Sequence, residues 1–389
     1  MSINSLQDLK VRDHELDGLL MLRSLLRHGL DASLYPRQVL ISNDGDDEFS
    51  WVHGVPSGSR LGSVTFAQDK RIRRALMQRS EVPVTQGRTF RMGQGSGAPQ
   101  KYAKKIGFPV VVKPAVGDNI IEAFADLKSP EDLEQALDYL RTPTTERAGF
   151  LRSAYGLTEL REPGEENGRI VVPPGYLYIV EKQLEGALVR FLVVDGEIRS
   201  VIRAKGSPAE GFLSGGVDII GKTHEELNDL AKKAAASVSG LSVAAVDIVV
   251  EDPSSSLEKQ EATVTDFTER PGLWIQERVD KALAHRLSDE MLEIYLKEHG
   301  RSIADPQDSI TVEFEAHAVP EPKVAGESLT QAAQDAGIEI TITDIDNVQG
   351  IVYSKMHGDA TEIAKLAQNL LDGLIDEHRV MLAEIRHTK

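Results

Sequence analysis

Short apolar runs bounded by polar turns set the pattern of the central part of the chain. Residues 110–112 form a wholly apolar, β-branched run, which is typical of a strand buried on both faces. The pair Asp195-Gly196 separates two apolar runs by two residues, and this spacing predicts a hairpin turn. This hairpin covers residues 190–198, and further strands are predicted at residues 38–41, 178–180, 217–220, 244–250, 263–267, 339–343 and 350–355.

Segments with helical spacing of apolar residues alternate with these strands. Leucines at this spacing predict one amphipathic helix within residues 1–30. Segment 129–132 combines a capping serine, a proline at the first helical position and acids in the first turn, so it predicts a helix start. Thr223 and Glu226 predict a capping box for another helix. Further helices are predicted at residues 65–80, 100–106, 277–298 and 328–336, and from residue 359.

The order of these elements predicts an α/β fold with α+β lobes in three parts. A length of 389 residues exceeds what one hydrophobic core usually supports. We expect a small N-terminal α/β lobe at residues 1–64, a central domain at 65–308 with a lid lobe at about 107–180, and a C-terminal α+β domain at 309–389. Residues 141–175 form a proline-containing insertion, which either faces a substrate or partner or is a plain surface loop.

Composition narrows the classes of partner. The net charge of −17 argues against binding to nucleic acid or to an anionic membrane, because both need basic patches. The chain has no cysteine, so disulfides, thiolate metal sites and cysteine nucleophiles are excluded. Neither a signal sequence nor an apolar run long enough to span a bilayer stands out, and we expect a cytoplasmic protein.

Charged residues interrupt the apolar strands at a few positions. Lys113 closes the run 110–112, where a buried ammonium is costly unless it meets an anion. Arg190 and Arg203 lie in otherwise apolar strands, and an arginine that faces inward there requires a carboxylate or another anion. Asp247 interrupts a run of alanine, valine and isoleucine, so we expect its carboxylate to bind a cation.

Six motifs occur in an order that resembles the ATP-grasp fold. They are Asp69-Lys70, GFPVVVKP at 107–114, VEKQLEG at 180–186, RFLVVDG at 190–196, AVDIVVE at 245–251 and DFTERPG at 266–272. The resemblance covers roughly residues 63–300 and is greatest to carboxylate–amine ligases, such as the amide-forming module of cyanophycin synthetase and the family that adds glutamates to a ribosomal protein. It implies that residues 65–308 are an ATP-grasp domain.

The resemblance implies an ATP-dependent, ADP-forming ligase that makes an amide or peptide bond through an acyl phosphate. Its substrates would be a small carboxylate and an amine, on amino acids or small peptides, and its cofactors ATP and Mg²⁺. The nucleotide would be held by Lys70, Lys113, Gly117, Glu181, Lys182, Gln183, Leu184, Glu185 and Lys205. The catalytic arginines would be Arg190 and Arg203, and the metal ligands Asp247, Asp266 and Thr268.

The chain departs from the family pattern at several of these places. Only Gly117 remains in a phosphate loop that has several glycines in relatives. Leu188 replaces an acid expected at the ribose, where Glu185 could substitute. Thr268 stands where relatives have an asparagine, and Glu269 is an alternative metal ligand. These departures keep open a degenerate ATP-grasp protein that binds nucleotide or a partner chain without turnover.

Other functional features stay undecided at the level of sequence. Arg270, Arg278 and Arg286 either hold a substrate carboxylate or lie on solvated helix faces. The residues do not identify the carboxylate, the amine or the oligomeric state, for which a homo-oligomer is one option. A thioester-forming or carboxylating member of the same superfamily is disfavoured, because the chain has no biotin-type lysine motif.

Overall fold

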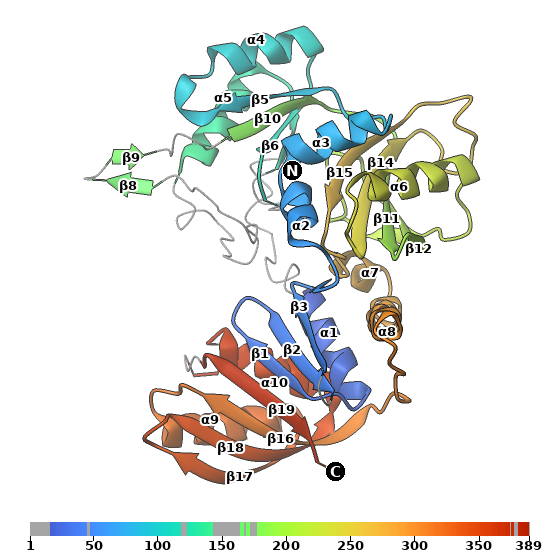
Figure 1. Ribbon diagram of the computed structural model, residues 1–389. Coiled ribbons are helices and arrows are strands. Elements are labelled where there is room, and N and C mark those ends of the chain that lie inside the picture. Colours follow the sequence, from blue (N-terminus) through green and yellow to red (C-terminus); the bar gives the residue numbers. More distant parts are fainter. Residues whose placement is uncertain are drawn as a thin grey trace. The chain divides into compact units, whose positions relative to one another are not determined.

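The computed structural model of this chain divides into two units, each built from antiparallel sheets and helices (Figure 1). Unit 1 comprises Met1–His14 and Ser59–Asp280, and unit 2 comprises Glu15–Gly58 and Lys281–Lys389. The structure describes residues 16–44, 47–117, 123–142, 164–166, 169–171, 177–373, 375–376 and 380–388. This mixture of helices and sheets confirms the predicted α/β fold with α+β lobes.

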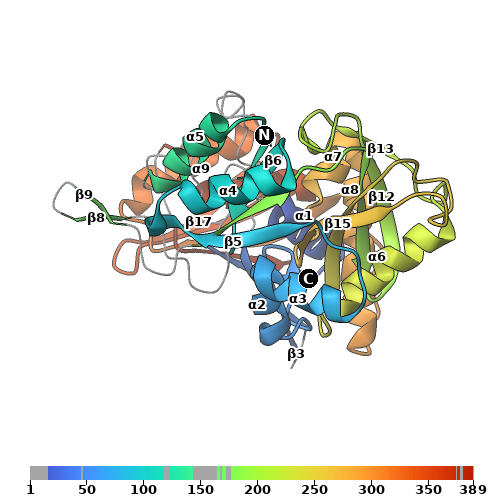
Figure 2. The same ribbon diagram turned by 90° about the horizontal axis from the view of Figure 1, so that it is seen from above.

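Unit 1 contains a four-stranded antiparallel sheet with the order β5-β10-β6-β7. Figure 1 labels β5, β10 and β6, and Figure 2 shows β5 and β6 from above. Its strands are β5 (Gly87–Arg91), β6 (Val110–Pro114), β7 (Phe124–Leu127) and β10 (Leu177–Lys182). Helices α4 (Gly97–Ile106) and α5 (Pro130–Arg141) bury Ala103, Leu133 and Leu137 in the same apolar cluster as Val110 and Val112. The predicted cap of α5 is present, since the side chains of Ser129 and Asp132 each accept a hydrogen bond from the other's backbone amide.

A five-stranded antiparallel sheet, also in unit 1, has the order β13-β12-β11-β14-β15. Its strands are β11 (Ala187–Val194), β12 (Glu197–Ala204), β13 (Gly216–Asp218), β14 (Val243–Val250) and β15 (Ala262–Thr268). The predicted turn joins β11 to β12, with positive φ at both Asp195 (49°) and Gly196 (74°), as the favoured two-residue hairpin requires. All eight residues of β14 are buried, which agrees with an apolar run that only Asp247 interrupts.

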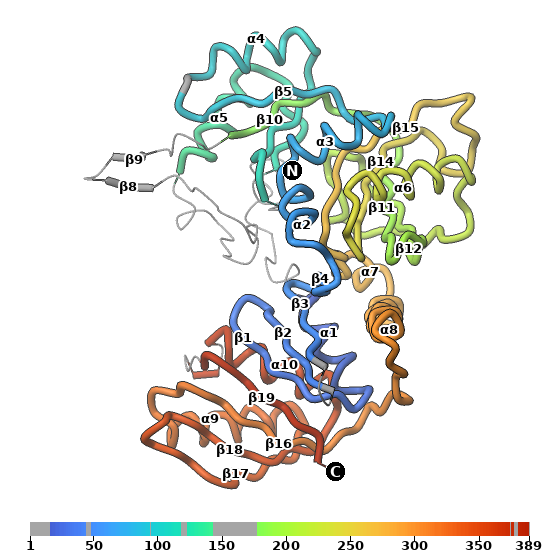
Figure 3. The backbone as a smooth tube through the Cα atoms, in the orientation of Figure 1, coloured from blue at the N-terminus to red at the C-terminus, as the bar shows by residue number. Residues whose placement is uncertain are grey.

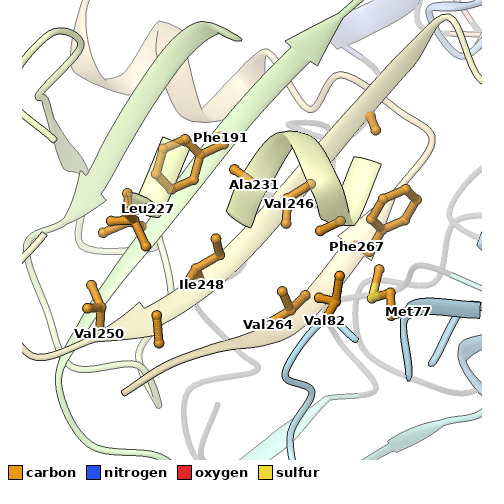
Figure 4. Packing of buried hydrophobic residues seen from close by; sticks show 14 of the residues in the cluster. Met77, Val82, Phe191, Leu227, Ala231, Val246, Ile248, Val250, Val264 and Phe267 are labelled. Carbon is orange, nitrogen blue, oxygen red and sulfur yellow. The ribbon is translucent and has the colours of Figure 1, made fainter. Parts of the chain in front are cut away.

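One face of this sheet packs against α6 (Glu225–Ser237) and forms the main apolar core of unit 1 (Figure 4). Phe191, Val246 and Ile248 from the sheet meet Leu227 and Ala231 of the helix, and each is fully buried. Further helices of unit 1 are α2 (Leu61–Gln68), α3 (Lys70–Arg79) and α7 (Trp274–Val279). Burial of this face leaves the opposite face of the sheet for other contacts.

Unit 2 is built on an eight-stranded sheet with the order β17-β18-β16-β19-β1-β2-β3-β4. The early strands are β1 (Ala32–Tyr35), β2 (Val39–Asp44), β3 (Asp47–Val52) and β4 (Val55–Pro56), and the late ones are β16 (Ser309–His317), β17 (Glu339–Asp346), β18 (Ile351–Asp359) and β19 (Leu382–His387). Its helices are α1 (Leu16–Arg27), α8 (Lys281–Glu298), α9 (Pro322–Asp335) and α10 (Ala360–Leu371).

This sheet corrects the prediction of separate domains at residues 1–64 and 309–389. Strand β1 pairs with β19, so an early, blue segment and a late, red segment of the chain share one sheet (Figure 3). The boundary of the central domain also shifts, because α8 belongs to unit 2. A hydrophobic pattern identifies a strand but not its partner, and pairing between distant segments leaves no local signal.

Three local predictions also need correction or fall outside the described residues. The helix predicted at 65–80 is two helices, α2 and α3, interrupted at Asp69, whose side chain caps α3 by accepting from the Arg71 amide. His224, rather than Thr223, is the N-cap of α6. Most of the predicted 141–175 insertion lies outside the described residues, apart from residues 141–142 and the strands β8 (Gly164–Glu166) and β9 (Arg169–Val171).

None of the helices in the described ranges combines the length and apolar content that a bilayer crossing requires.

Replacement of Phe191 by alanine tests the core of unit 1. We expect Phe191→Ala to lower the free energy of unfolding by about 3–5 kcal/mol, because it removes a fully buried ring and leaves a cavity. Phe66→Ala on α2 is the control, since Phe66 is 43% exposed and its loss should change stability by less than about 0.5 kcal/mol. Urea unfolding followed by circular dichroism measures both. Equal effects of the two variants would contradict this assignment of the core.

Candidate active site

A cavity of about 210 Å³ in unit 1 is lined by residues of both sheets and by the loop 208–213. The sheet face opposite α6 supplies one wall. There Leu188 of β11 lies directly opposite Val249 of β14, and Arg190 lies opposite Asp247 two residues along. Paired residues project from the same face of an antiparallel sheet, so an apolar pair and a charged pair lie side by side on this wall.

Arg190 and Asp247 form a bidentate ion pair in this wall. Arg190 Nε donates to Asp247 Oδ1 and a terminal nitrogen donates to Oδ2, both at 2.6 Å. The side chains are only 13% and 9% exposed, respectively. The guanidinium carbon also lies 5.3 Å from the centre of the Phe212 ring. The anion that the sequence requires for Arg190 is therefore a carboxylate of the chain itself.

Lys113 also meets carboxylates of the chain. Its ammonium lies 2.7 Å from Glu181 Oε1 and 3.5 Å from Asp266 Oδ2, and it donates to the Thr265 carbonyl at 3.0 Å. Burial alone would lower the pKa of Lys113, but Asp266 and Glu181 outweigh it and the pKa is raised. The predicted need for an anion is thus met, although an external phosphate is not required to meet it.

Two arginines that the sequence reasoning missed complete this cluster. Arg74 of α3 donates to Glu181 Oε2 at 2.7 Å, and Arg73 bonds Asp266 and the Phe267 carbonyl. Both lie on the same helical face as Met77, which is part of the apolar core. Their spacing from Met77 could have identified them from the sequence, because cations at core-facing helix positions need buried partners.

The cluster around Lys113 brings several cations together. Its cations are Lys70, Arg73, Arg74 and Lys113, and its carboxylates are Glu181 and Asp266. Of these cations, Lys113 lines the cavity itself. Cations gathered at a cavity attract anions that enter it.

Eight of the fourteen predicted site residues line the cavity. They are Lys113, Glu181, Lys182, Gln183, Leu184, Arg190, Asp247 and Asp266. The amides of Lys182 and Gln183 donate to the carbonyls of Gln86 and Pro109 at 2.9 and 3.3 Å. Among the described residues 182–184, this leaves the Leu184 amide as the one not engaged in these backbone bonds.

Lys70 and Gly117 lie beside the cavity rather than in its lining. The Lys70 ammonium donates to the Gly117 carbonyl at 2.5 Å and borders a small neighbouring cavity, of about 20 Å³, together with Lys113 and Asp266. The residues that follow Gly117 in the predicted phosphate loop, 118–122, are outside the described residues.

The structure does not bring Arg203 or Lys205 to the cavity, and both are exposed. A two-residue turn would set Arg203 on the same face as Arg190, but the register of the hairpin shifts between Leu192 and Val193. As a result Arg203 pairs with Val189 and projects from the α6 side of the sheet. A β-bulge of this kind reverses the facing of every later residue, which corrects the prediction.

Glu185, Thr268 and Glu269 are also outside the lining. Glu185 is exposed, and Thr268 is buried with its hydroxyl accepting from the Arg270 amide at 3.1 Å. Glu269 is buried and accepts from the Gln68 side chain at 2.8 Å. These contacts give Thr268 and Glu269 structural partners and leave Asp247 and Asp266 as the carboxylates at the cavity.

Asp247 and Asp266 fit a magnesium ion in donor type and placement. They pair directly across β14 and β15, so two carboxylates face the cavity side by side. Carboxylate oxygen is the donor that Mg²⁺ prefers. Each carboxylate already has a cationic partner, Arg190 for Asp247 and Arg73 with Lys113 for Asp266. The described group with the closest metal-like spacing, Glu315, His317 and Glu384, lies in unit 2.

The three arginines left undecided by the sequence differ in setting. Arg278 packs over the Trp274 ring at 5.1 Å and donates to the Leu213 carbonyl at 3.0 Å, which anchors the loop that lines the cavity. Arg270 is buried, and Arg286 is exposed on α8 in unit 2. The solvated interpretation therefore holds for Arg286.

Comparison with solved structures finds similar proteins, whereas no family model and no curated protein matches the sequence. A bifunctional glutathione synthetase from Pasteurella multocida shares 16% identity, with 67% of this chain and 41% of that chain covered and a TM-score of 0.39. A D-alanine–D-alanine ligase from Bacillus anthracis shares 15% identity, over 62% of this chain and 69% of that one, with a TM-score of 0.41. The ATP-grasp ligase PsnB, in complex with the precursor peptide PsnA2 and AMPPNP, shares 16% over 58% and 57%, with a TM-score of 0.36.

The chain thus resembles ATP-grasp ligases in structure as well as in sequence motifs. It spans 41% of the length of the glutathione synthetase. With TM-scores below 0.5 and identities of at most 16%, these likenesses assign no substrate and no site residue to this chain.

Acid unfolding tests the cation cluster around Asp266. Burial would raise the pKa of this carboxyl, but Lys113, Arg73 and Lys70 outweigh burial and hold the pKa well below its usual range. Such a carboxylate stabilises the fold above its unfolded pKa of about 3.9, and the stabilisation is lost as the pH falls. The urea midpoint of the parent should therefore fall more steeply between about pH 5 and pH 2 than that of Asp266→Asn.

The exposed Glu258 provides the control for this experiment. Glu258→Gln should keep the acid dependence of the parent. If Asp266→Asn also keeps it, the native cluster does not depress the pKa of Asp266.

Proposed function

We propose that this chain is an ATP-dependent, ADP-forming ligase that joins a small carboxylate to an amine through an acyl phosphate. The observation that carries the proposal is a cavity in which an apolar pair, Leu188 and Val249, adjoins a charged pair and the cation cluster around Lys113. A nucleotide triphosphate has the complementary pattern of a flat ring and a polyanion. The ordered sequence motifs give independent support.

The apolar part of the cavity suits a purine base. Val111 of β6 joins Leu188 and Val249 in the lining, and transfer of an aromatic ring out of water against such side chains is favourable. The Leu184 amide would donate to the ring edge. The phosphates would then reach Lys113, beside which Lys70, Arg73 and Arg74 lie.

In the proposed reaction an oxygen of the substrate carboxylate attacks the γ-phosphorus, and the bond from that phosphorus to the β–γ bridging oxygen breaks to release ADP. The amine then attacks the carbonyl carbon of the acyl phosphate, loses a proton and releases phosphate. Such phosphoryl transfer depends mainly on positioning and charge neutralisation. Asp247 and Asp266 would hold the magnesium, which when bound offsets charge on the phosphates, and Arg190 would offset charge on the transferring group.

A nucleotide-binding protein without turnover is the second candidate. It is favoured by the Arg190–Asp247 pair, because both oxygens of a proposed metal ligand are bonded to a guanidinium. It is also favoured by Leu188, an apolar side chain where the family pattern places an acid. This candidate requires the cavity and the cation cluster but no divalent cation.

Turnover separates the two candidates. Purified protein with ATP, Mg²⁺ and a panel of amino acids and small peptides should release ADP and phosphate only when a carboxylate and an amine are both present. Omission of either substrate is the control for simple ATP hydrolysis. Nucleotide binding without ADP release in any mixture would support the binder, and AMP release would contradict acyl-phosphate chemistry.

Lys113→Met tests the nucleotide site directly. We expect it to weaken binding of a non-hydrolysable ATP analogue by about tenfold or more, since it removes a charge-assisted bond to phosphate. Isothermal titration calorimetry gives the affinity, and circular dichroism shows whether the fold is kept. Lys222→Met, which changes an exposed lysine outside the cavity, should bind like the parent. Parent-like affinity of a folded Lys113→Met would remove Lys113 from the site.

A further inference from the structure

We propose that Arg190 competes with a divalent cation for the carboxylate of Asp247, so that the metal enters only when Arg190 is released to an anion in the cavity. This inference rests on the proposed metal role of Asp247 and Asp266. It adds a second task for Arg190, which becomes the internal counter-ion of the ligand-free site.

Arg190 already meets the electrostatic demand of Asp247. Both carboxylate oxygens accept from the guanidinium at 2.6 Å, and the two residues face each other across β11 and β14. Bidentate pairs of this geometry are the strong ones, and removal of one partner leaves an uncompensated buried charge. A cation that takes Asp247 must therefore replace Arg190 or share the carboxylate with it.

Strand β15, which carries Asp266, shows why neutralisation by side-chain cations and neutralisation by a metal ion are alternatives. Asp247 and Asp266 are direct partners across β14 and β15, so two like charges lie side by side. In this structure separate cations neutralise them, Arg190 at Asp247 and Lys113 with Arg73 at Asp266. One divalent ion bound by both carboxylates would neutralise them together.

The guanidinium lies at the cavity, where an anion other than Asp247 can meet it. On one side it lies 5.3 Å from the centre of the Phe212 ring, in the loop that lines the cavity. On another side is Gly272, where an added Cβ would lie 3.0 Å from an Arg190 terminal nitrogen. Arg190 itself lines the cavity, so a phosphate or carboxylate bound there is within the region that its head group can reach.

Release of Arg190 to such an anion would free Asp247 for the metal. By thermodynamic reciprocity, the anion then strengthens metal binding by the same factor by which the metal strengthens anion binding. The ligand-free protein should accordingly bind a divalent cation weakly.

Binding of Mn²⁺ to the full chain without nucleotide tests this inference, with free Mn²⁺ measured by electron paramagnetic resonance. Arg190→Met should bind Mn²⁺ about tenfold more tightly than the parent or better, the scale on which changes around a metal ligand alter affinity. Arg203→Met is the matched control, since this arginine lies on the same hairpin but projects from the other face, and it should bind like the parent. The double variant Arg190→Met/Asp247→Asn should lose the gain.

Arg190→Lys covers the case in which Arg190→Met does not fold. Lysine keeps the charge but cannot make the bidentate contact, so this variant should show a smaller gain in Mn²⁺ affinity. Parent-like or weaker Mn²⁺ binding by a folded Arg190→Met, or by Arg190→Lys when the methionine variant is unfolded, would overturn the competition.

A separate titration with the ATP analogue distinguishes failure of this inference from failure of the proposed function. A gain of Mn²⁺ affinity in Arg190→Met, together with no nucleotide binding by the parent, would leave the competition intact and remove the ligase proposal. Nucleotide binding by the parent, without any gain of Mn²⁺ affinity in the variants, would overturn the competition and leave the ligase proposal intact.

Discussion

Desolvation of the Lys113 ammonium is the constraint on which the candidate site depends. A buried cation is tolerated only with anionic partners, and Lys113 has one in each of the two larger sheets of unit 1: Glu181 on β10 and Asp266 on β15. The same ammonium therefore couples the four-stranded sheet to the five-stranded sheet. Arg73 of α3 also pairs with Asp266, and Arg74 pairs with Glu181, so one helix and two sheets contribute to the same cluster.

The two faces of the five-stranded sheet explain why the cavity has an apolar part beside a charged part. Residues that alternate along β11 and β14 face either α6 or the cavity. Those that face α6 are apolar and form the main core of unit 1, whereas the cavity face changes from the apolar pair Leu188–Val249 to the charged pair Arg190–Asp247 within two residues. Of the two faces, only the cavity face therefore places an apolar surface next to charged groups.

The sequence predicted the strands that carry the site but not the facing of every residue on them. Lys113, Arg190 and Asp247 stood out because each interrupts or ends an apolar run, and each has an ionic partner in the structure. Arg203 had the same signal but projects from the other face. It lies on β12, where the successive residues 200–202 are all buried, so the pattern of this strand does not reveal facing. The register shift between Leu192 and Val193 is a feature of pairing rather than of local sequence.

Stability alone does not account for the Arg190–Asp247 pair. Replacement of a buried ion pair by well-packed apolar residues is often neutral or stabilising, because the desolvation of two charges offsets much of their attraction. The neighbouring pair Leu188–Val249 shows that the wall of this cavity accommodates apolar side chains at the preceding position. A charged pair kept beside it, within a cavity and next to a second carboxylate, is better explained by a task in which the ions exchange partners. Packing of the cavity wall alone would not require a buried carboxylate at this position.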